Sequence, residues 1–164
     1  MSWYVLHVSP LREIDVRDGL IKKGYEAAVP REMAIERSGG TWRERIRLFF
    51  PSYVFVRCDM TDADYYALTN TDYVLRILGR PTPIDADEAL YIEYLTPTRE
   101  PLNHSRAIRD GDRIRVISGP LVGKEARIVK IEQRAKRATV RIALFREIHD
   151  IKMSLDIVAG PQGS

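Results

Sequence analysis

The stretch Leu48-Phe49-Phe50-Pro51-Ser52-Tyr53-Val54-Phe55-Val56 decides the fold of this chain. Its last four residues all favour strands. Pro51 cannot donate a ladder hydrogen bond, so it separates this strand from the residues before it. Alternate side chains of a strand point to opposite faces, so Tyr53 and Phe55 share one face and the two valines share the other. Either the strand is central and buried on both faces, or the valines face a core and the aromatic residues form a docking surface.

Length and composition indicate an ordinary water-soluble protein with one medium domain or two small ones. The chain has 164 residues, of which 45% are apolar and 30% are charged. It has no apolar run long enough to cross a membrane and no signal-peptide pattern at its N-terminus. Cys58 is the single cysteine, which excludes an internal disulfide and suits a reducing compartment. The three histidines are far apart in sequence, so neither a metal site nor a cofactor is expected.

The charge is divided unevenly along the chain. Residues 1–105 hold 13 Lys and Arg against 16 Asp and Glu, a net charge of −3. Residues 106–164 hold 13 against 7, a net charge of +6. This split predicts two modules with different partners, the second partner being anionic.

The first module is predicted to mix helices and strands. Hydrophobic periodicity and turn residues predict strands at 3–8, 25–30, 53–58 and 74–78, and helices at 13–23, 61–70 and 85–95. The turn Ser38-Gly39-Gly40 predicts a hairpin with arms at 33–36 and 41–48. Because both arms are highly charged, this hairpin is expected to project into solvent.

The second module is predicted to be all-β. Residues 98–107 contain few apolar side chains and are interpreted as a linker. Period-two patterns follow, and they predict short strands at 112–117, 124–131, 139–143, 147–152 and 155–158. Closely spaced short strands of this kind are typical of a small barrel. The predicted fold class is therefore α+β, with a first domain at 1–97, a linker at 98–107 and a barrel domain at 108–164.

Several short segments, in order and correctly spaced, resemble the NusG family of transcription elongation factors. The first domain resembles the family's NGN domain, an antiparallel sheet with helices, through Trp3-Tyr4-Val5, Val29-Pro30 and Phe49-Phe50-Pro51-Ser52-Tyr53-Val54. The second resembles its KOW domain, an SH3-like barrel, through Gly111-Asp112-Arg113-Ile114-Arg115-Val116 and Gly119-Pro120-Leu121. The resemblance covers nearly the whole chain, and it suggests no enzyme family.

The resemblance implies a binding partner and a contact surface. In this family the NGN domain binds the clamp helices of the largest subunit of bacterial RNA polymerase, holds the polymerase closed and suppresses pausing. The positions that match its contacts are His7, Phe50, Tyr53, Phe55, Asp64, Tyr65 and Tyr66. The last three match the helix that approaches the opposite pincer of the polymerase, with the alternative that Tyr65 or Tyr66 belongs to the core.

Three departures from the family pattern imply a specialised member. Ser52 stands where the family usually has glycine after the Phe-Pro pair, and Leu121 stands where its KOW loop has phenylalanine. Phe145 is followed by Arg146, where the family often has glycine. These changes resemble a paralogue of the LoaP or RfaH kind, LoaP being the closer, which acts as an antiterminator on selected operons. The alternatives are a general NusG-type factor whose KOW domain recruits Rho or the ribosome, and a ribosome-associated KOW protein.

The second module carries a cluster of basic residues. A solvated basic face is the simplest interpretation of such a cluster, but the contrast with the acidic first module favours nucleic acid. No aromatic pair lies in the cluster, which favours a structured RNA hairpin over stacked single-stranded bases, with DNA as the alternative. The candidate nucleic-acid-binding residues are Lys124, Arg127, Lys130, Arg134, Lys136, Arg137, Arg141 and Arg146.

The function expected from these observations is that of a transcription elongation and antitermination factor. It is a cytoplasmic monomer that binds RNA polymerase and a leader RNA hairpin, with no membrane partner. No nucleophile motif, phosphate loop or paired catalytic carboxylates stand out, so no enzymatic activity is expected. Many of the last strands' residues are isoleucine and valine, which predicts a stable β-barrel rather than the helical form that RfaH-like relatives adopt.

Overall fold

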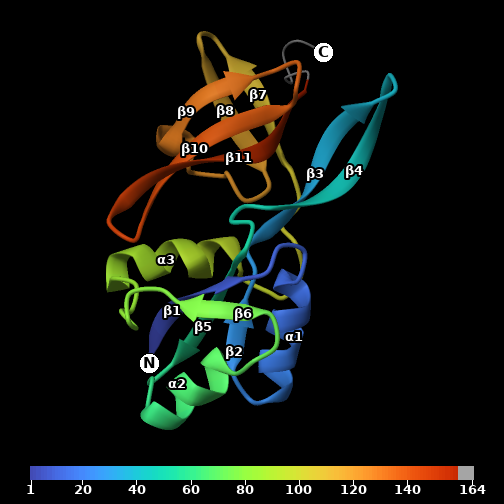
Figure 1. Cartoon of the computed structure of the whole chain (residues 1–164). Helices are drawn as coiled ribbons and strands as arrows, with labels where there is room; N and C mark the ends of the chain where they lie inside the picture. Colours follow the sequence, from blue (N-terminus) through green and yellow to red (C-terminus); the bar gives the residue numbers. More distant parts are fainter. Residues whose placement is uncertain (159–164) are drawn as a thin grey trace. The chain divides into compact units, whose positions relative to one another are not determined.

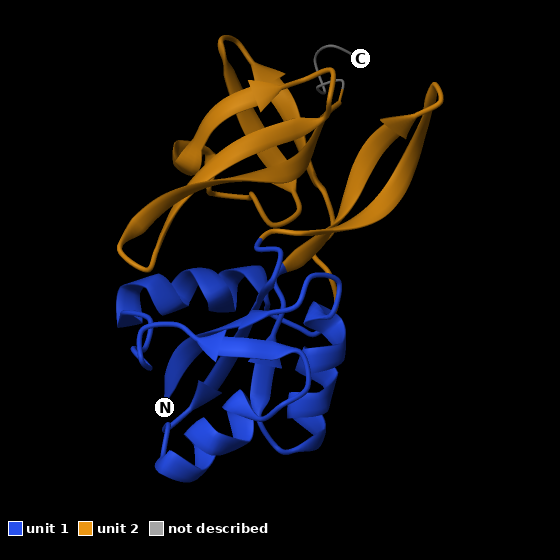
Figure 2. Ribbon diagram, in the orientation of Figure 1, with its two compact units in different colours: residues 1–30, 50–99 blue, residues 31–49, 100–164 orange. Residues whose placement is uncertain are grey.

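A computed structural model describes residues 1–158 and divides them between two compact units. Unit 1 combines residues 1–30 with 50–99, and unit 2 combines residues 31–49 with the chain from residue 100 on (Figure 2). The end of the predicted second domain, residues 159–164, lies outside the described residues. The elements are, in chain order, β1 (Ser2–Val8), α1 (Glu13–Lys22), β2 (Glu26–Ala28), β3 (Arg31–Ser38), β4 (Thr41–Leu48), β5 (Tyr53–Cys58), α2 (Asp62–Thr69), β6 (Val74–Ile77), α3 (Ala86–Leu95), β7 (Ser105–Asp110), β8 (Arg113–Ser118), the 3-10 turn η1 (Glu125–Arg127), β9 (Ile128–Glu132), β10 (Arg137–Leu144) and β11 (Glu147–Ile157) (Figure 1).

Unit 1 is built on a four-stranded antiparallel sheet in the order β2-β5-β1-β6. The predicted central strand is confirmed as β5, which lies between β1 and β2. Residues 54–56 are each at most 1% exposed, so this part of the strand is buried on both faces. Burial of the apolar side chains of β1 and β5 contributes favourably to the fold of this unit.

Two helices of unit 1, α1 and α2, have end signals that the sequence contains. Thr61 and Asp64 form a capping box at the start of α2, in which each side chain accepts from the other residue's backbone N–H. Helix α1 has Glu13 and Asp15 in its first turn and is followed by Gly24, whose φ is 95°. Acidic groups near the positive helix end and a glycine after the last turn are both stabilising.

Unit 2 contains a five-stranded sheet in the order β8-β7-β11-β10-β9, together with the β3-β4 hairpin. Strand β11 pairs antiparallel with β10 through Ser154 and then parallel with β7 from Leu155 on. Its two partners make it the strand that joins the two halves of the sheet. Alternate residues of β10, from Ala138 to Leu144, are buried in the barrel core. The mixed α+β class with an all-β second part agrees with the prediction.

Some predicted strand boundaries were wrong. The two strands expected at 147–152 and 155–158 form one strand, because β11 changes partner without leaving the sheet. The strand expected from residue 124 begins only at Ile128, after η1. Strand β7 was not predicted, and it begins at Ser105 within the segment interpreted as a linker.

The β3-β4 hairpin departs from the prediction that it projects into solvent. Its tip, residues 38–41, is exposed, but Glu32 and Ala34 at its base are fully buried. Met33 N–H donates to the carbonyl of Leu102 at 2.7 Å, and Leu102 N–H donates to the carbonyl of Arg31 at 2.9 Å. The base of the hairpin is thus part of the same compact unit as the barrel strands.

Candidate binding surfaces

The strand-turn-strand around Pro51 positions an aromatic cluster in unit 1. The rings of His7 and Tyr53 lie opposite each other on β1 and β5, with centroids 5.6 Å apart, and both are half-buried. Phe50 packs edge-on against Phe55, with centroids 5.7 Å apart. Phe55 is only 1% exposed and Phe50 8%. Of the four predicted contact residues in this cluster, His7 and Tyr53 are accessible, while Phe50 and Phe55 support them from the core.

A buried carboxylate holds the turn before Tyr53. Ser52 has a φ of 69°, in the left-handed region that favours glycine. Its N–H donates to Glu13 Oε2 at 2.8 Å, and its carbonyl accepts from Val8 N–H at 2.9 Å. Glu13 is 4% exposed. These bonds join the turn to α1 and β1, and so fix where β5 begins.

The predicted contact residues on α2 divide into two groups. Asp64 Oδ1 accepts from the Tyr25 hydroxyl at 2.7 Å, while Oδ2 takes part in the capping box. The hydrogen bond from Tyr25 lowers the pKa of Asp64, and burial followed by that same bond raises the pKa of Tyr25 to about 12. Tyr65 and Tyr66 are 40% and 67% exposed, so these two rings are on the surface rather than in the core.

Strand pairing brings to this face a residue that the sequence interpretation missed. Arg76 on β6 lies opposite His7, and His7 lies opposite Tyr53, so the three residues form a row across three neighbouring strands. We call Tyr53, His7 and Arg76 the cross-strand row. Exposed Leu75 precedes Arg76 on the same edge strand, at 60% exposure. Only the sheet order reveals the row, because the residues are far apart in sequence.

The basic residues of the barrel are partly paired with acids. Arg141 donates two hydrogen bonds to Asp150, of 2.9 and 3.2 Å, and these lower the pKa of Asp150. Glu132 accepts from Lys152 at 2.8 Å and lies 3.6 Å from Lys130, and the Lys152 bond is the main reason that its pKa is lowered. Among the predicted nucleic-acid residues, those exposed to solvent are Lys124, Arg127, Lys130, Arg134, Arg141 and Arg146.

The remaining two, Lys136 and Arg137, contact the hairpin. The Lys136 ammonium lies 4.2 Å from the centroid of the Trp42 ring, within the range of a cation–π interaction. Arg137 lies 3.6 Å from Glu36. Both the lysine and the arginine are half-buried as a result. The predicted basic cluster is therefore continuous with the hairpin rather than confined to the barrel.

An ion pair between half-buried Arg47 and the fully buried carboxylate of Glu32 fixes the hairpin to β11. Glu32 accepts from Arg47 Nη2 at 2.6 Å, from Ser154 N–H at 2.9 Å and from the Ser154 hydroxyl at 3.1 Å. The same hydroxyl accepts from Ile35 N–H at 3.2 Å. Glu32 is completely buried, and a buried carboxylate is stable only with such a set of donors.

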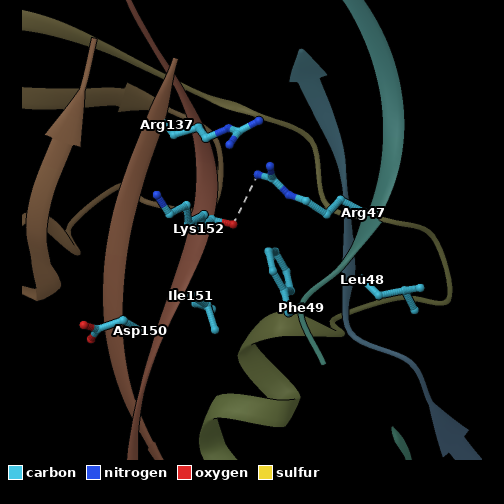
Figure 3. Close-up of a pocket in the computed structure, with 7 residues that line it drawn as sticks. All are labelled: Arg47, Leu48, Phe49, Arg137, Asp150, Ile151 and Lys152. Carbon is cyan, nitrogen blue, oxygen red and sulfur yellow. Dashed lines mark hydrogen bonds between the residues drawn. The ribbon is translucent and has the colours of Figure 1, made fainter. Parts of the chain in front are cut away.

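A pocket of about 300 Å³ opens beside this ion pair, entirely within unit 2 (Figure 3). Arg47, Leu48 and Phe49 line it at the end of the hairpin, and Arg137, Asp150, Ile151 and Lys152 line it from β10 and β11. Three of these side chains are cationic and one is a carboxylate. The sequence interpretation singled out only Arg137 of this set for binding.

The loop after β8 buries Leu121, one of the three residues that depart from the family pattern. Leu121 is fully buried, and its N–H donates to the Ser105 hydroxyl at 3.0 Å. A Cβ at Gly119 would lie 2.5 Å from Ser105 Cα, so the backbone here tolerates only glycine. Ile117 and Val122, on either side of this loop, are 47% and 51% exposed.

No site for metal chemistry accompanies these surfaces in the part of the chain that the structure describes. No three His, Cys, Asp or Glu side chains among residues 1–158 are placed to hold a metal ion. The described helices include none that is both long and apolar enough to span a membrane.

Comparison with known proteins places this architecture in a defined class. Residues 111–141 match the KOW motif, and residues 1–93 match the family described as transcription termination factor NusG. The fold and these matches define a two-part transcription factor of the NGN and KOW type. The match to the NusG family at residues 1–93 covers more than half of the chain, so the chain belongs to this family.

Individual relatives agree along nearly the full length. The transcription termination/antitermination protein NusG of Pasteurella multocida (strain Pm70) is 25% identical over 170 residues, covering 95% of this chain and 93% of its own. The protein of the same description from Thermus thermophilus is 25% identical over 166 residues, covering 88% and 90%. The solved structure described as "Domain interaction in Thermotoga maritima NusG" is 21% identical, covers 95% and 93%, and has a TM-score of 0.56, which shows a shared fold.

Proposed function

We propose that this chain is an antitermination factor that binds bacterial RNA polymerase in the cytoplasm through the cross-strand row of unit 1. The cross-strand row carries the proposal. It combines a half-buried aromatic pair with an exposed arginine on one sheet face. Aromatic residues and arginine are the side chains that dominate interface energies. Tyr65 and Tyr66, exposed on α2, supply a second contact for the opposite pincer of the polymerase.

Unit 2 supplies the selectivity in this proposal. Counted over the whole unit, it holds 18 Lys and Arg against 11 Asp and Glu, a net charge of +7, while unit 1 holds 8 against 12, a net charge of −4. The charge difference between the two parts is therefore larger when the hairpin is counted with the barrel than when the chain is divided at residue 105. A basic surface of this kind binds phosphate backbones, and a leader RNA hairpin is the partner we propose. We place the chain with the LoaP-like members that act on selected operons.

The test is a binding titration with purified bacterial RNA polymerase. Tyr53→Ala and Arg76→Ala are each expected to weaken binding by about 2 kcal/mol, the usual cost of removing an interface anchor. Leu90→Ala, which removes an exposed apolar side chain of α3, is the matched control and is expected to bind normally. Normal binding by both row variants, with their melting temperatures unchanged, would contradict the proposed polymerase surface.

A second candidate is a general factor whose KOW domain recruits Rho or a ribosomal protein. The exposed apolar pair Ile117 and Val122 beside the Gly-Pro-Leu loop favours it, because an exposed apolar pair is suited to a protein partner. Pull-down with the full-length chain from bacterial extract separates the candidates. Ile117→Asp and Val122→Asp would abolish recovery of Rho or ribosomal subunits only under the second one.

A further inference from the structure

The pocket between the end of the hairpin and strands β10 and β11 combines cations with an aromatic ring. Arg47, Arg137 and Lys152 line it together with one carboxylate, Asp150. The ring of Phe49 points into the space toward Ile151 and Lys152 (Figure 3). A volume of about 300 Å³ is at the lower end of the range for ligand pockets. The chemistry is that of a site for a small anion attached to a flat apolar group.

The cations of the pocket are not equally available to a ligand. Arg47 is held by the buried carboxylate of Glu32 at 2.6 Å and also donates to the carbonyl of Lys152. By contrast, Arg137 lies 3.6 Å from Glu36, which is longer than a hydrogen bond. The buried Nε of Arg137 has no hydrogen-bond partner among the described residues. This Nε is closed to solvent, but the Arg137 side chain as a whole is 30% exposed, so its terminal nitrogens keep donors for an incoming oxyanion, while Arg47 serves to hold the pocket wall in place.

The second available cation and the ring lie at the same pocket. Lys152 is exposed and pairs with Glu132 at 2.8 Å, a surface ion pair of small net value that a phosphate can replace. Phe49 is half-buried and follows directly after β4, so the hairpin positions it. A ring of this kind can stack on a nucleobase, and Arg and Lys can pair with its phosphate.

We propose that this pocket binds a single nucleoside phosphate unit within an RNA strand. Arg137 and Lys152 hold the phosphate, and Phe49 packs against an unstacked base. The inference rests on the proposed function, in which unit 2 contacts RNA, and it adds the hairpin to that contact. The same chemistry would accept a free nucleotide, but the exposed basic residues that continue along unit 2, such as Arg134 and Arg141, favour a polymer with more phosphates.

The experiment titrates the full-length chain with a labelled, mixed-sequence single-stranded RNA at several salt concentrations. Arg137→Gln is expected to weaken binding and to reduce the log–log salt slope by about 0.7, the value of one lost phosphate contact on a single strand. Phe49→Leu keeps an apolar side chain and is expected to weaken binding about tenfold with an unchanged salt slope, because stacking releases no counterions. The control is Arg115→Gln, which removes an exposed arginine of β8 outside the pocket.

The outcomes separate this inference from the proposed function. If the wild-type chain binds RNA and the pocket variants match Arg115→Gln in affinity and slope, the pocket is not the nucleotide site, although unit 2 still binds RNA. If the wild-type chain binds no RNA in this titration, the pocket assignment is overturned, while the polymerase titration still decides the proposed function separately. A second titration uses adenosine 5′-monophosphate in place of the RNA. If this free nucleotide binds as tightly as the RNA, the pocket is a small-ligand site and the RNA assignment is overturned. Lys152→Gln repeats the phosphate test if Arg137→Gln lowers the melting temperature.

Discussion

Ser52 shows what a single residue can and cannot reveal from sequence. Its position after the Phe-Pro pair, where related chains usually have glycine, was interpreted only as a mark of a specialised member, and its φ of 69° is in the left-handed region that favours glycine. A side chain other than glycine in that region costs about 1 kcal/mol. The compensating hydrogen bond to Glu13 was not predictable, because a buried carboxylate on α1 has the same sequence pattern as an exposed one.

Tyr53 and Phe55 show that strand alternation alone does not predict which side chains are exposed. Strand alternation predicted that the two side chains share one face, and it left open whether that face is buried. The structure buries Phe55 against Phe50 and leaves Tyr53 half-buried beside His7. The difference depends on which elements cover each end of the strand, and this information is not contained in the strand's own residues.

The Tyr25–Asp64 hydrogen bond predicts a loss of stability in alkaline solution. Burial, with the Asp64 bond second, raises the pKa of Tyr25 from 10.0 to about 12. A folded-state pKa above the unfolded value means that the contribution is complete below pH 10 and is lost as the pH rises toward 12. The expected result is a free energy of unfolding that falls over this range in the wild type and falls less in Tyr25→Phe.

Urea unfolding at a series of pH values provides the measurement. At neutral pH, Tyr25→Phe should cost about 1 kcal/mol, the usual net value of one hydrogen bond. Tyr73→Phe, which removes the hydroxyl of an exposed tyrosine, is the control. An alkaline loss of the same size in Tyr25→Phe and in the wild type would show that another group causes it.

At the scale of elements, the sequence predicted those helices and strands whose own residues contain the signals that start and end them. The helix expected at 61–70 and the strand expected at 53–58 match α2 and β5 closely. Strand β7 was missed because its six residues follow a proline-containing segment and half of them are exposed. The length of β11 depends on its two pairing partners, and pairing over such sequence distances leaves no local signal.

The β10-β11 turn predicts that unit 2 is more stable with glycine than with alanine at position 146. Leu144 pairs with Glu147, so the loop has two residues, Phe145 and Arg146, with φ values of 54° and 58°. Positive φ at both positions is the type I′ geometry, which favours glycine at the second of them. Arg146→Gly is expected to be more stable than Arg146→Ala by about 1 kcal/mol, because only glycine relieves the left-handed strain.

Comparing the two substitutions removes the contribution of the arginine side chain itself. Both variants lack that side chain, so their difference in urea midpoint reports on the backbone alone. Equal midpoints would mean that the turn is not held in the left-handed conformation in solution.

At the scale of the whole molecule, the sequence predicted two parts of opposite charge and included the hairpin in the first domain at 1–97. Glu32 and Ser154 are 122 positions apart, and they form the buried hydrogen bonds that join the hairpin to β11. A charged arm is typical of a solvent-exposed hairpin, so the buried carboxylate could not be predicted from pattern. The pocket was missed for the same reason, since its lining residues come together only when the hairpin packs on the barrel strands.

The two tryptophans of the chain can test this arrangement, because Trp3 lies in unit 1 and Trp42 in unit 2. Trp3→Phe leaves a fluorescent probe of the hairpin, and Trp42→Phe leaves a probe of the first sheet. Glu32→Gln removes the charge that pairs with Arg47, and loss of one partner of a buried ion pair is strongly destabilising. We expect Glu32→Gln to lower the free energy of unfolding reported by Trp42 by about 2 kcal/mol or more, and to leave the transition reported by Trp3 nearly unchanged.

Glu44→Gln, at an exposed position on the same hairpin, is the control and should shift neither transition. Equal shifts in the two transitions would mean that the hairpin unfolds with residues 1–30 and 50–99, as the predicted first domain at 1–97 implies. A shift confined to Trp42 would mean that the hairpin and the barrel are one folding unit. The nucleotide pocket proposed between them would then be preformed in the free protein, because its two walls would be held together before any RNA binds.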